Sequence, residues 1–137
     1  MIKTTDQLYH HSLLLIFIMN YRQKLGRTGE ELARQYLAAK GHNILNSNVK
    51  ISYKEIDIVC IKDGILIFVE VKTRTNTNFG SAEEVFSRAK TKNLKMAISL
   101  YLNRFHHNYR DIRLDMISVD INIINKTAKI KHYKDIG

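Results

Sequence analysis

The chain has 137 residues, a formal net charge of +9, a single cysteine and no proline or tryptophan. This length allows one domain with a substantial core, and 45% hydrophobic and 26% charged residues are ordinary values for a soluble globular protein. The sequence excludes a disulfide-stapled scaffold and, because it has no apolar run of about 18 residues, a membrane-spanning helix. We expect a cytoplasmic protein with no membrane partner. The basic charge favours a polyanionic partner such as nucleic acid, although basic proteins without one are common.

Residues 1–20 contain an apolar run, Leu13 to Met19, that is short enough for the core of a signal peptide. Only Lys3 supplies a positive charge before it and no small-x-small cleavage site follows, so we do not expect a signal peptide. Two alternatives remain: a loose N-terminal extension that precedes a true start at Met19, or an ordered helix that packs its apolar face elsewhere. Residues 21–137 are expected to form the folded domain.

A helix is expected over residues 21–40, ended by Gly41. Its apolar residues fill one arc at about 100° per residue, and Glu30 lies at the edge of that arc. The Glu30 carboxylate is therefore expected to lie where the helix meets the sheet; the alternative is a boundary glutamate with no task. Residues 42–50 follow as a first strand, weakened by the polar run Asn46, Ser47 and Asn48.

Residues 54–74 are expected to form a β-hairpin, because two apolar runs flank Asp63-Gly64, a strong two-residue turn signal. Such a turn pairs residues whose numbers sum to 127, which sets Asp57 opposite Glu70. Alternation then places Glu55, Asp57, Glu70 and Lys72 on one face, opposite a wholly apolar face of Ile56, Ile58, Cys60, Ile67, Val69 and Val71. A three-residue turn with a glycine bulge is the alternative, and it would shift the pairing by one.

The charged end of this hairpin predicts a metal site that hydrolyses phosphodiester bonds. Opposed side chains have Cβ atoms about 4.5–5.5 Å apart, and two carboxylates at that range repel unless a proton, a cation or a metal lies between them. Two carboxylates suit Mg²⁺, and a lysine beside them suits phosphodiester hydrolysis. The alternative is an edge hairpin whose charges are simply solvated.

A polar segment at residues 73–80 follows, in which Arg74 is expected to touch a phosphate backbone unless the segment is a plain connector. A second helix is expected over 81–102, beginning with a Ser81-x-x-Glu84 capping box. The apolar side is expected to be Val85, Phe86, Ala89, Met96, Ala97, Leu100 and Tyr101. Four basic residues form either a phosphate-binding patch or a solvated face: Arg88, Lys90, Lys92 and Lys95.

Two further strands are expected over 111–121, where Asp115 interrupts the apolar alternation and is taken to be structural, and over 123–133, with a turn at Asn125-Lys126. The order is thus helix, three strands, helix, one or two strands, an α/β layered domain.

The motifs resemble those of a known family. Asp57 with Glu70-Val71-Lys72 matches the D…ExK signature of restriction-endonuclease-like nucleases. Residues 22–121 as a whole resemble the YraN-like family of small bacterial proteins, through Gly26–Ala33, Glu55–Asp57, Phe68–Arg74 and Phe79-Gly80. That family is similar to archaeal Holliday-junction resolvases in its nuclease motifs. One departure is Lys54, where the family usually has glycine.

The resemblance implies a three-layer α/β/α core with a mixed central sheet and a metal-dependent endonuclease acting on DNA, selective for DNA structure. It implies Asp57 and Glu70 as ligands of Mg²⁺ or Mn²⁺, Lys72 as the catalytic lysine and Glu30 as a helix carboxylate that aids the site. Resolvase-like nucleases commonly act as homodimers. The alternative is a non-catalytic nucleic-acid-binding module on the same fold, motivated by the charge of +9.

Overall fold

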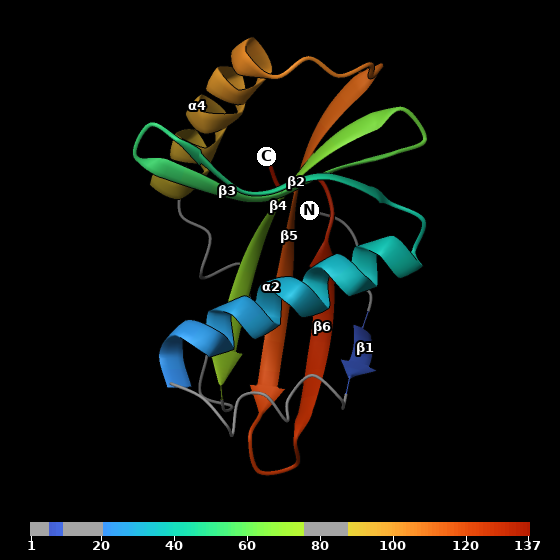
Figure 1. The fold of residues 1–137 in the computed structure, drawn as a ribbon, viewed down its shortest axis with the longest axis vertical. Coiled ribbons are helices and arrows are strands. Elements are labelled where there is room, and N and C mark those ends of the chain that lie inside the picture. Colours follow the sequence, from blue (N-terminus) through green and yellow to red (C-terminus); the bar gives the residue numbers. More distant parts are fainter. Residues whose placement is uncertain (1–5, 10–20, 76–87) are drawn as a thin grey trace.

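A computed structural model describes residues 6–9, 21–75 and 88–137, which form a six-stranded mixed sheet with one helix on each face (Figure 1). Along the sheet the strand order is β1-β6-β5-β4-β3-β2, and only β4 and β5 are parallel. The elements are β1 (Asp6–Tyr9), α2 (Tyr21–Ala39), β2 (Asn43–Ile51), β3 (Lys54–Lys62), β4 (Ile65–Thr75), α4 (Arg88–Arg104), β5 (Asp111–Asn122) and β6 (Thr127–Tyr133). The expected α/β fold with its mixed central sheet is confirmed. In the described part of the chain, neither helix is long and apolar enough to cross a membrane.

The β3–β4 hairpin has the predicted register. Its pairs run from Lys62–Ile65 to Ile58–Val69, and their residue numbers all sum to 127. Asp63 and Gly64 both have positive φ, 51° and 76°, as a two-residue type I′ turn requires. The alternative of a three-residue turn is therefore wrong. The pairing stops one step before Asp57 and Glu70 would meet.

The core lies in two layers, one on each face of the sheet. On one face α2 buries Leu32, Ala33, Tyr36 and Leu37 against a layer that includes Ile58, Cys60 and Val69. On the other face α4 buries Leu94, Ala97, Ile98 and Tyr101 against a layer that includes Val59, Leu66 and Phe68. Strand β4 is buried on both faces, which is typical of a central strand in an α/β sheet.

One predicted face assignment is wrong, and it bears on the site. Alternation put Ile56 on the same face as Ile58, but Ile56 packs in the α4 layer together with Val59. The alternation breaks around Asp57, where β3 has lost its pairing to β4 and the Asp57 carboxylate instead accepts a 2.8 Å hydrogen bond from the Val71 N–H. The acidic end of β3 therefore turns toward α2, not toward α4.

Other boundaries also differ from expectation. Residues 6–9 form β1, which pairs with β6 as an unpredicted edge strand, whereas the apolar run 13–19 lies outside the described residues. The last strand begins at Thr127 because residues 123–126 form the turn, which leaves Ile124 86% exposed. Met96 and Leu100 of α4 are 59% and 45% exposed, because the helix buries a stripe one step away from them. The Ser81–Glu84 capping box and residues 85–87 also lie outside the description.

Candidate functional site

Three carboxylates from two elements meet at the start of β3. Glu30 comes from α2, and Glu55 and Asp57 come from β3; one oxygen of each lies within 4.8 Å of the others. Glu30 and Asp57 are half-buried, and Glu55 is exposed. We call these three residues the acidic cluster. The expectation that Glu30 projects to the charged end of the hairpin agrees with this arrangement.

Gly29 explains how α2 comes so close to the sheet. A Cβ atom placed on Gly29 would lie 1.8 Å from Oγ1 of Thr73 in β4, far inside van der Waals contact. Any other residue would force the Thr73 side chain or the helix to shift at this point. The glycine thus brings Glu30, its immediate neighbour, down to the level of the β3 carboxylates.

Asn48 of β2 connects two members of the acidic cluster. Its Nδ2 donates hydrogen bonds to Oε2 of Glu30 at 2.6 Å and to Oε1 of Glu55 at 3.1 Å. Asn48 has a φ of 52°, in the left-handed region that asparagine tolerates better than most residues. The partial positive charge on these amide N–H groups offsets part of the repulsion between the two carboxylates.

The sequence interpretation missed Asn48, which it took only as a residue that weakens a strand. A signal was available in the register next to the β2–β3 turn, where the pairs from Asn46–Val59 to Ile51–Lys54 have residue numbers that sum to 105. The pairs Ser47–Ile58 and Val49–Ile56 lie on either side of Asn48 and Asp57. A two-residue turn at Ser52-Tyr53 would have predicted this register. That turn carries no glycine or asparagine, so it was not recognised.

The Asp57 carboxyl has a strongly perturbed pKa. Burial, and then the nearby negative charge of Glu70, raise the pKa of Asp57 from 3.8 to about 7; the hydrogen bond from the Val71 N–H opposes this rise, and the charges of Glu30 and Glu55 add to it. The Asp57 carboxyl therefore binds a proton more tightly than an ordinary aspartate does. A bound cation would displace that proton, because it would stabilise the ionised form.

Glu70 and Lys72 lie on β4, and Glu70 is near enough for its charge to raise the pKa of Asp57. Glu70 is only 9% exposed, and its Oε1 is 3.5 Å from Nζ of Lys72, whose side chain is 30% exposed. Glu70 acts on Asp57 through its charge, but the three oxygens that lie together belong to Glu30, Glu55 and Asp57. The assignment of Asp57 and Glu70 as a metal-ligand pair remains a prediction, and the geometry adds Glu30 and Glu55 as candidates.

The acidic cluster could hold a metal ion. Oxygens bound to one Mg²⁺ at about 2.1 Å in octahedral geometry lie roughly 3–4 Å apart. The cluster oxygens, within 4.8 Å of one another, would need to move together only slightly to reach that spacing. The donor set consists of hard carboxylate oxygens, which suit Mg²⁺, Mn²⁺ or Ca²⁺, and does not select among them.

The basic candidates differ in availability. Arg74 is committed to β5: its Nε is 3.3 Å from Oδ1 of Asp120, its Nη2 is 3.1 Å from Oγ of Ser118, and its side chain is only 14% exposed. Lys92 and Lys95 are exposed on α4, whereas the side chains of Arg88 and Lys90 lie outside the description. Helix α4 connects the parallel strands β4 and β5 and so runs opposite to them.

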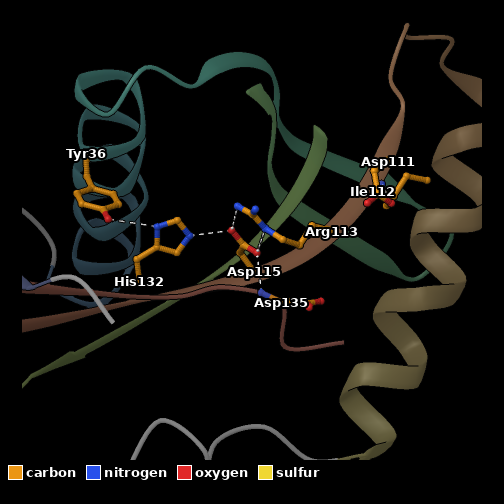
Figure 2. Close-up of polar contacts among 7 residues, drawn as sticks. All are labelled: Tyr36, Asp111, Ile112, Arg113, Asp115, His132 and Asp135. Carbon is orange, nitrogen blue, oxygen red and sulfur yellow. Dashed lines mark hydrogen bonds and ion pairs between the residues drawn. The ribbon is translucent and has the colours of Figure 1, made fainter. Parts of the chain in front are cut away.

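A second polar group lies deep in the domain and is closed to ligands (Figure 2). His132 of β6 contacts the Tyr36 hydroxyl through Nδ1 at 3.2 Å and Oδ2 of Asp115 through Nε2 at 2.8 Å. Arg113 and the Asp135 N–H donate to the same carboxylate, and Asp115 is 0% exposed. Burial alone would raise the pKa of Asp115, but the hydrogen bonds from His132, Arg113 and Asp135 lower it. Asp115 is thus the structural residue that the sequence predicted.

These features define a small α/β domain whose acidic cluster lies at one end of a central hairpin and could hold a metal ion. The chain belongs to UPF0102, described as an uncharacterised protein family, whose model matches residues 29–119. A "UPF0102 protein" of Syntrophomonas wolfei subsp. wolfei is 44% identical over 110 residues, covering 80% of this chain and 94% of the relative. A "UPF0102 protein CLL_A1253" of Clostridium botulinum is 37% identical over 115 residues, covering 84% and 94%. The resemblance to the YraN-like family, which UPF0102 represents, is confirmed, and the similarity to restriction-endonuclease-like nucleases remains a prediction.

Proposed function

We propose that this protein is a divalent-metal-dependent nuclease that hydrolyses phosphodiester bonds in DNA. The observation that carries the proposal is the convergence of three carboxylate oxygens from α2 and β3 within 4.8 Å, with Glu70 near enough for its charge to raise the pKa of Asp57. The matching motifs, which resemble those of restriction-endonuclease-like nucleases, imply the same chemistry. The +9 charge is of the sign that a polyanionic substrate needs.

Each residue of the site has a distinct task in this proposal. Glu30, Glu55 and Asp57 would hold Mg²⁺ or Mn²⁺, with Glu70 as a further ligand or as a neighbouring charge. The ion, when bound, would neutralise charge on the phosphodiester and lower the pKa of a water molecule. Lys72, kept in place by Glu70 at 3.5 Å, would orient the attacking water and donate a hydrogen bond to the oxygen on which negative charge develops.

DNA would approach along the same end of the sheet. The exposed Lys92 and Lys95 in the first half of α4 would be available for phosphate contacts. Arg88 and Lys90 belong to the same proposed patch. The guanidinium of Arg74 is already paired with Asp120, so Arg74 would attract DNA through its positive charge more than through a direct bond to a phosphate. A homodimer, implied only by the motif resemblance, is tested directly by sedimentation of the full chain.

Calorimetric titration with Mn²⁺ tests the metal site. We expect binding by the wild type and at least tenfold weaker binding by Asp57→Asn, because the variant removes one charged ligand without changing its shape. Glu31→Gln is the matched control: Glu31 neighbours Glu30 on α2 but is paired with Arg34 at 2.6 Å, away from the site. Equal binding by all three proteins would refute the metal site.

Digestion of linear, nicked and four-way DNA with Mg²⁺ or Mn²⁺ tests the reaction. We expect cleavage by the wild type and by Glu31→Gln, and a loss of at least about 100-fold in Asp57→Asn and Lys72→Ala. Failure of the wild type to cut any of these substrates, or equal cutting by the Asp57 variant, would refute the nuclease.

The exposed Lys92 and Lys95 favour a second candidate, a nucleic-acid-binding module without catalysis. Metal-free gel shifts over a salt series would then show binding that weakens steeply with salt, while neither metal binding nor cutting is observed.

A further inference from the structure

The turn between β2 and β3 presents a tyrosine that the fold does not use. Ser52 and Tyr53 form this two-residue turn, with Ser52 at a φ of 55°. Tyr53 is 99% exposed, so it contributes almost nothing to the core. Such turns favour glycine, asparagine or aspartate, so turn geometry does not call for an aromatic residue either.

Tyr53 lies close to the acidic cluster along the chain. Ile51 pairs with Lys54 and Lys50 pairs with Glu55, so the turn is the direct continuation of the strand that carries two of the three clustered carboxylates. Glu55 follows Tyr53 by two residues, which is about 7 Å along an extended strand. The tyrosine is therefore two residues along the chain from Glu55, which belongs to the candidate metal site.

The charges around the ring indicate what it would contact. Lys50 and Lys54 flank the turn and are both exposed. Two ammonium groups beside an aromatic ring are complementary to a nucleotide, whose phosphate is anionic and whose base has a flat π-face. They do not suit an acidic peptide equally well, because the ring would then have no planar partner.

We propose that Tyr53 is a base-stacking residue that holds an unpaired nucleotide of DNA next to the acidic cluster, with Lys50 and Lys54 on the adjoining phosphates. The inference rests on the proposed function for its substrate class, and it adds that the substrate has an unpaired base next to the position of cleavage. Stacked bases within a duplex do not offer a free face to a tyrosine, whereas overhangs, flaps and the openings of branched DNA do.

The test is metal-free binding, measured by fluorescence anisotropy with the full chain at fixed low salt. The probes are a blunt duplex and the same duplex with a short single-stranded overhang. For Tyr53→Ala we expect affinity for the overhang probe to fall about 5- to 150-fold, and to fall by much less for the blunt probe. Tyr53→Phe should bind as the wild type does, and Tyr53→Leu should bind as Tyr53→Ala does, because leucine is apolar but cannot stack.

Tyr109→Ala is the matched control. Tyr109 is another exposed tyrosine, but it lies next to Arg110, which bonds to Gly64 at the opposite end of β3. Its substitution should leave both affinities unchanged. Lys54→Ala should reduce the slope of binding against salt, whereas Tyr53→Ala should not, since a stacked ring releases no counterions.

The outcomes separate this inference from the nuclease proposal. If the wild type binds and cuts DNA but the Tyr53 variants bind the overhang probe as tightly as it does, base stacking is refuted and the nuclease stands. Equal losses on both probes, or full binding by Tyr53→Leu, would also refute stacking. If the overhang preference depends on Tyr53 but nothing is cut with any metal, the nuclease is refuted and the stacking residue stands. If no DNA binds even at low salt, both are refuted.

Discussion

Replacing Asp57 with asparagine should stabilise the metal-free protein, although Asp57 is the central candidate ligand. Burial and the charge of Glu70 raise the pKa of Asp57 from 3.8 to about 7. The folded state therefore binds this proton more tightly than the unfolded chain does. The contribution of the protonated Asp57 to the free energy of unfolding is fully present below about pH 4 and is lost as the pH rises to about 7. Asparagine keeps an oxygen to accept the Val71 N–H hydrogen bond and carries no charge.

The magnitude follows from the size of the shift. Each pKa unit corresponds to 1.36 kcal/mol, so ionised Asp57 costs the fold about 2–4 kcal/mol at pH 8 once partial exposure is taken into account. At pH 5 the cost is about 1–2 kcal/mol. The advantage of Asp57→Asn over the wild type should therefore grow by roughly 1–2 kcal/mol between pH 5 and pH 8, equivalent to roughly 3–8 °C in Tm.

Thermal unfolding in a chelator at both pH values measures this quantity. Taking the difference between variant and wild type removes the contribution of other titrating groups. Glu31→Gln is the control, because the hydrogen bond from Arg34 lowers the pKa of Glu31, so the loss of that carboxylate should not stabilise the fold. Mn²⁺ should raise the Tm of the wild type and not that of Asp57→Asn. A difference between Asp57→Asn and wild type that is flat with pH would refute the reasoning about the site's electrostatics.

Three further predictions concern the scaffold. Gly29→Ala should lower the free energy of unfolding by about 1–3 kcal/mol and weaken Mn²⁺ binding, because its Cβ would lie 1.8 Å from Oγ1 of Thr73. Denaturant unfolding measures the first effect and calorimetry the second, and unchanged values would contradict the close approach. Tyr36→Phe should cost about 1–2 kcal/mol in denaturant unfolding, since it leaves Nδ1 of the buried His132 without this partner; no loss would contradict the contact. Burial lowers the pKa of His42 to about 4, so the contribution of His42 to stability should be fully present well above pH 6.5 and fall by about 2–3 kcal/mol as the pH drops to 4. The difference between wild type and His42→Gln in an acid titration measures this contribution, and a difference that is flat with pH would contradict it.

Local chemistry explains which parts of the fold the sequence could predict. The hairpin register followed from Asp63 and Gly64 alone, because both residues tolerate the positive φ that a type I′ turn needs. The end of α2 followed from Gly41, whose φ of 89° places it in the left-handed region. The buried Cys60 followed from its place on an apolar face. In each case the deciding residues lie close together in the chain.

Features decided by distant contacts were missed. Strand β1 has no apolar alternation and exists because β6 offers it an edge. The direction of the acidic end of β3 depends on Gly29 and Asn48, which belong to different elements and reach the site only in the folded domain. The buried stripe of α4 was misplaced because both Leu94 and Met96 suit a helix, and only packing against the sheet selects Leu94.

The contrast between Asp115 and Asp57 is the strongest reason to assign a function to the acidic cluster. Asp115 is fully buried, yet His132, Arg113 and a backbone N–H lower its pKa, which is how a fold satisfies a structural carboxylate. Asp57 receives one backbone hydrogen bond and lies near three other carboxylates that raise its pKa. Selection for stability alone would remove such a residue or give it a cationic partner, as it has for Asp115. A carboxylate that lacks a cationic partner, in a core whose other buried carboxylate has one, is expected where a bound ligand supplies the positive charge.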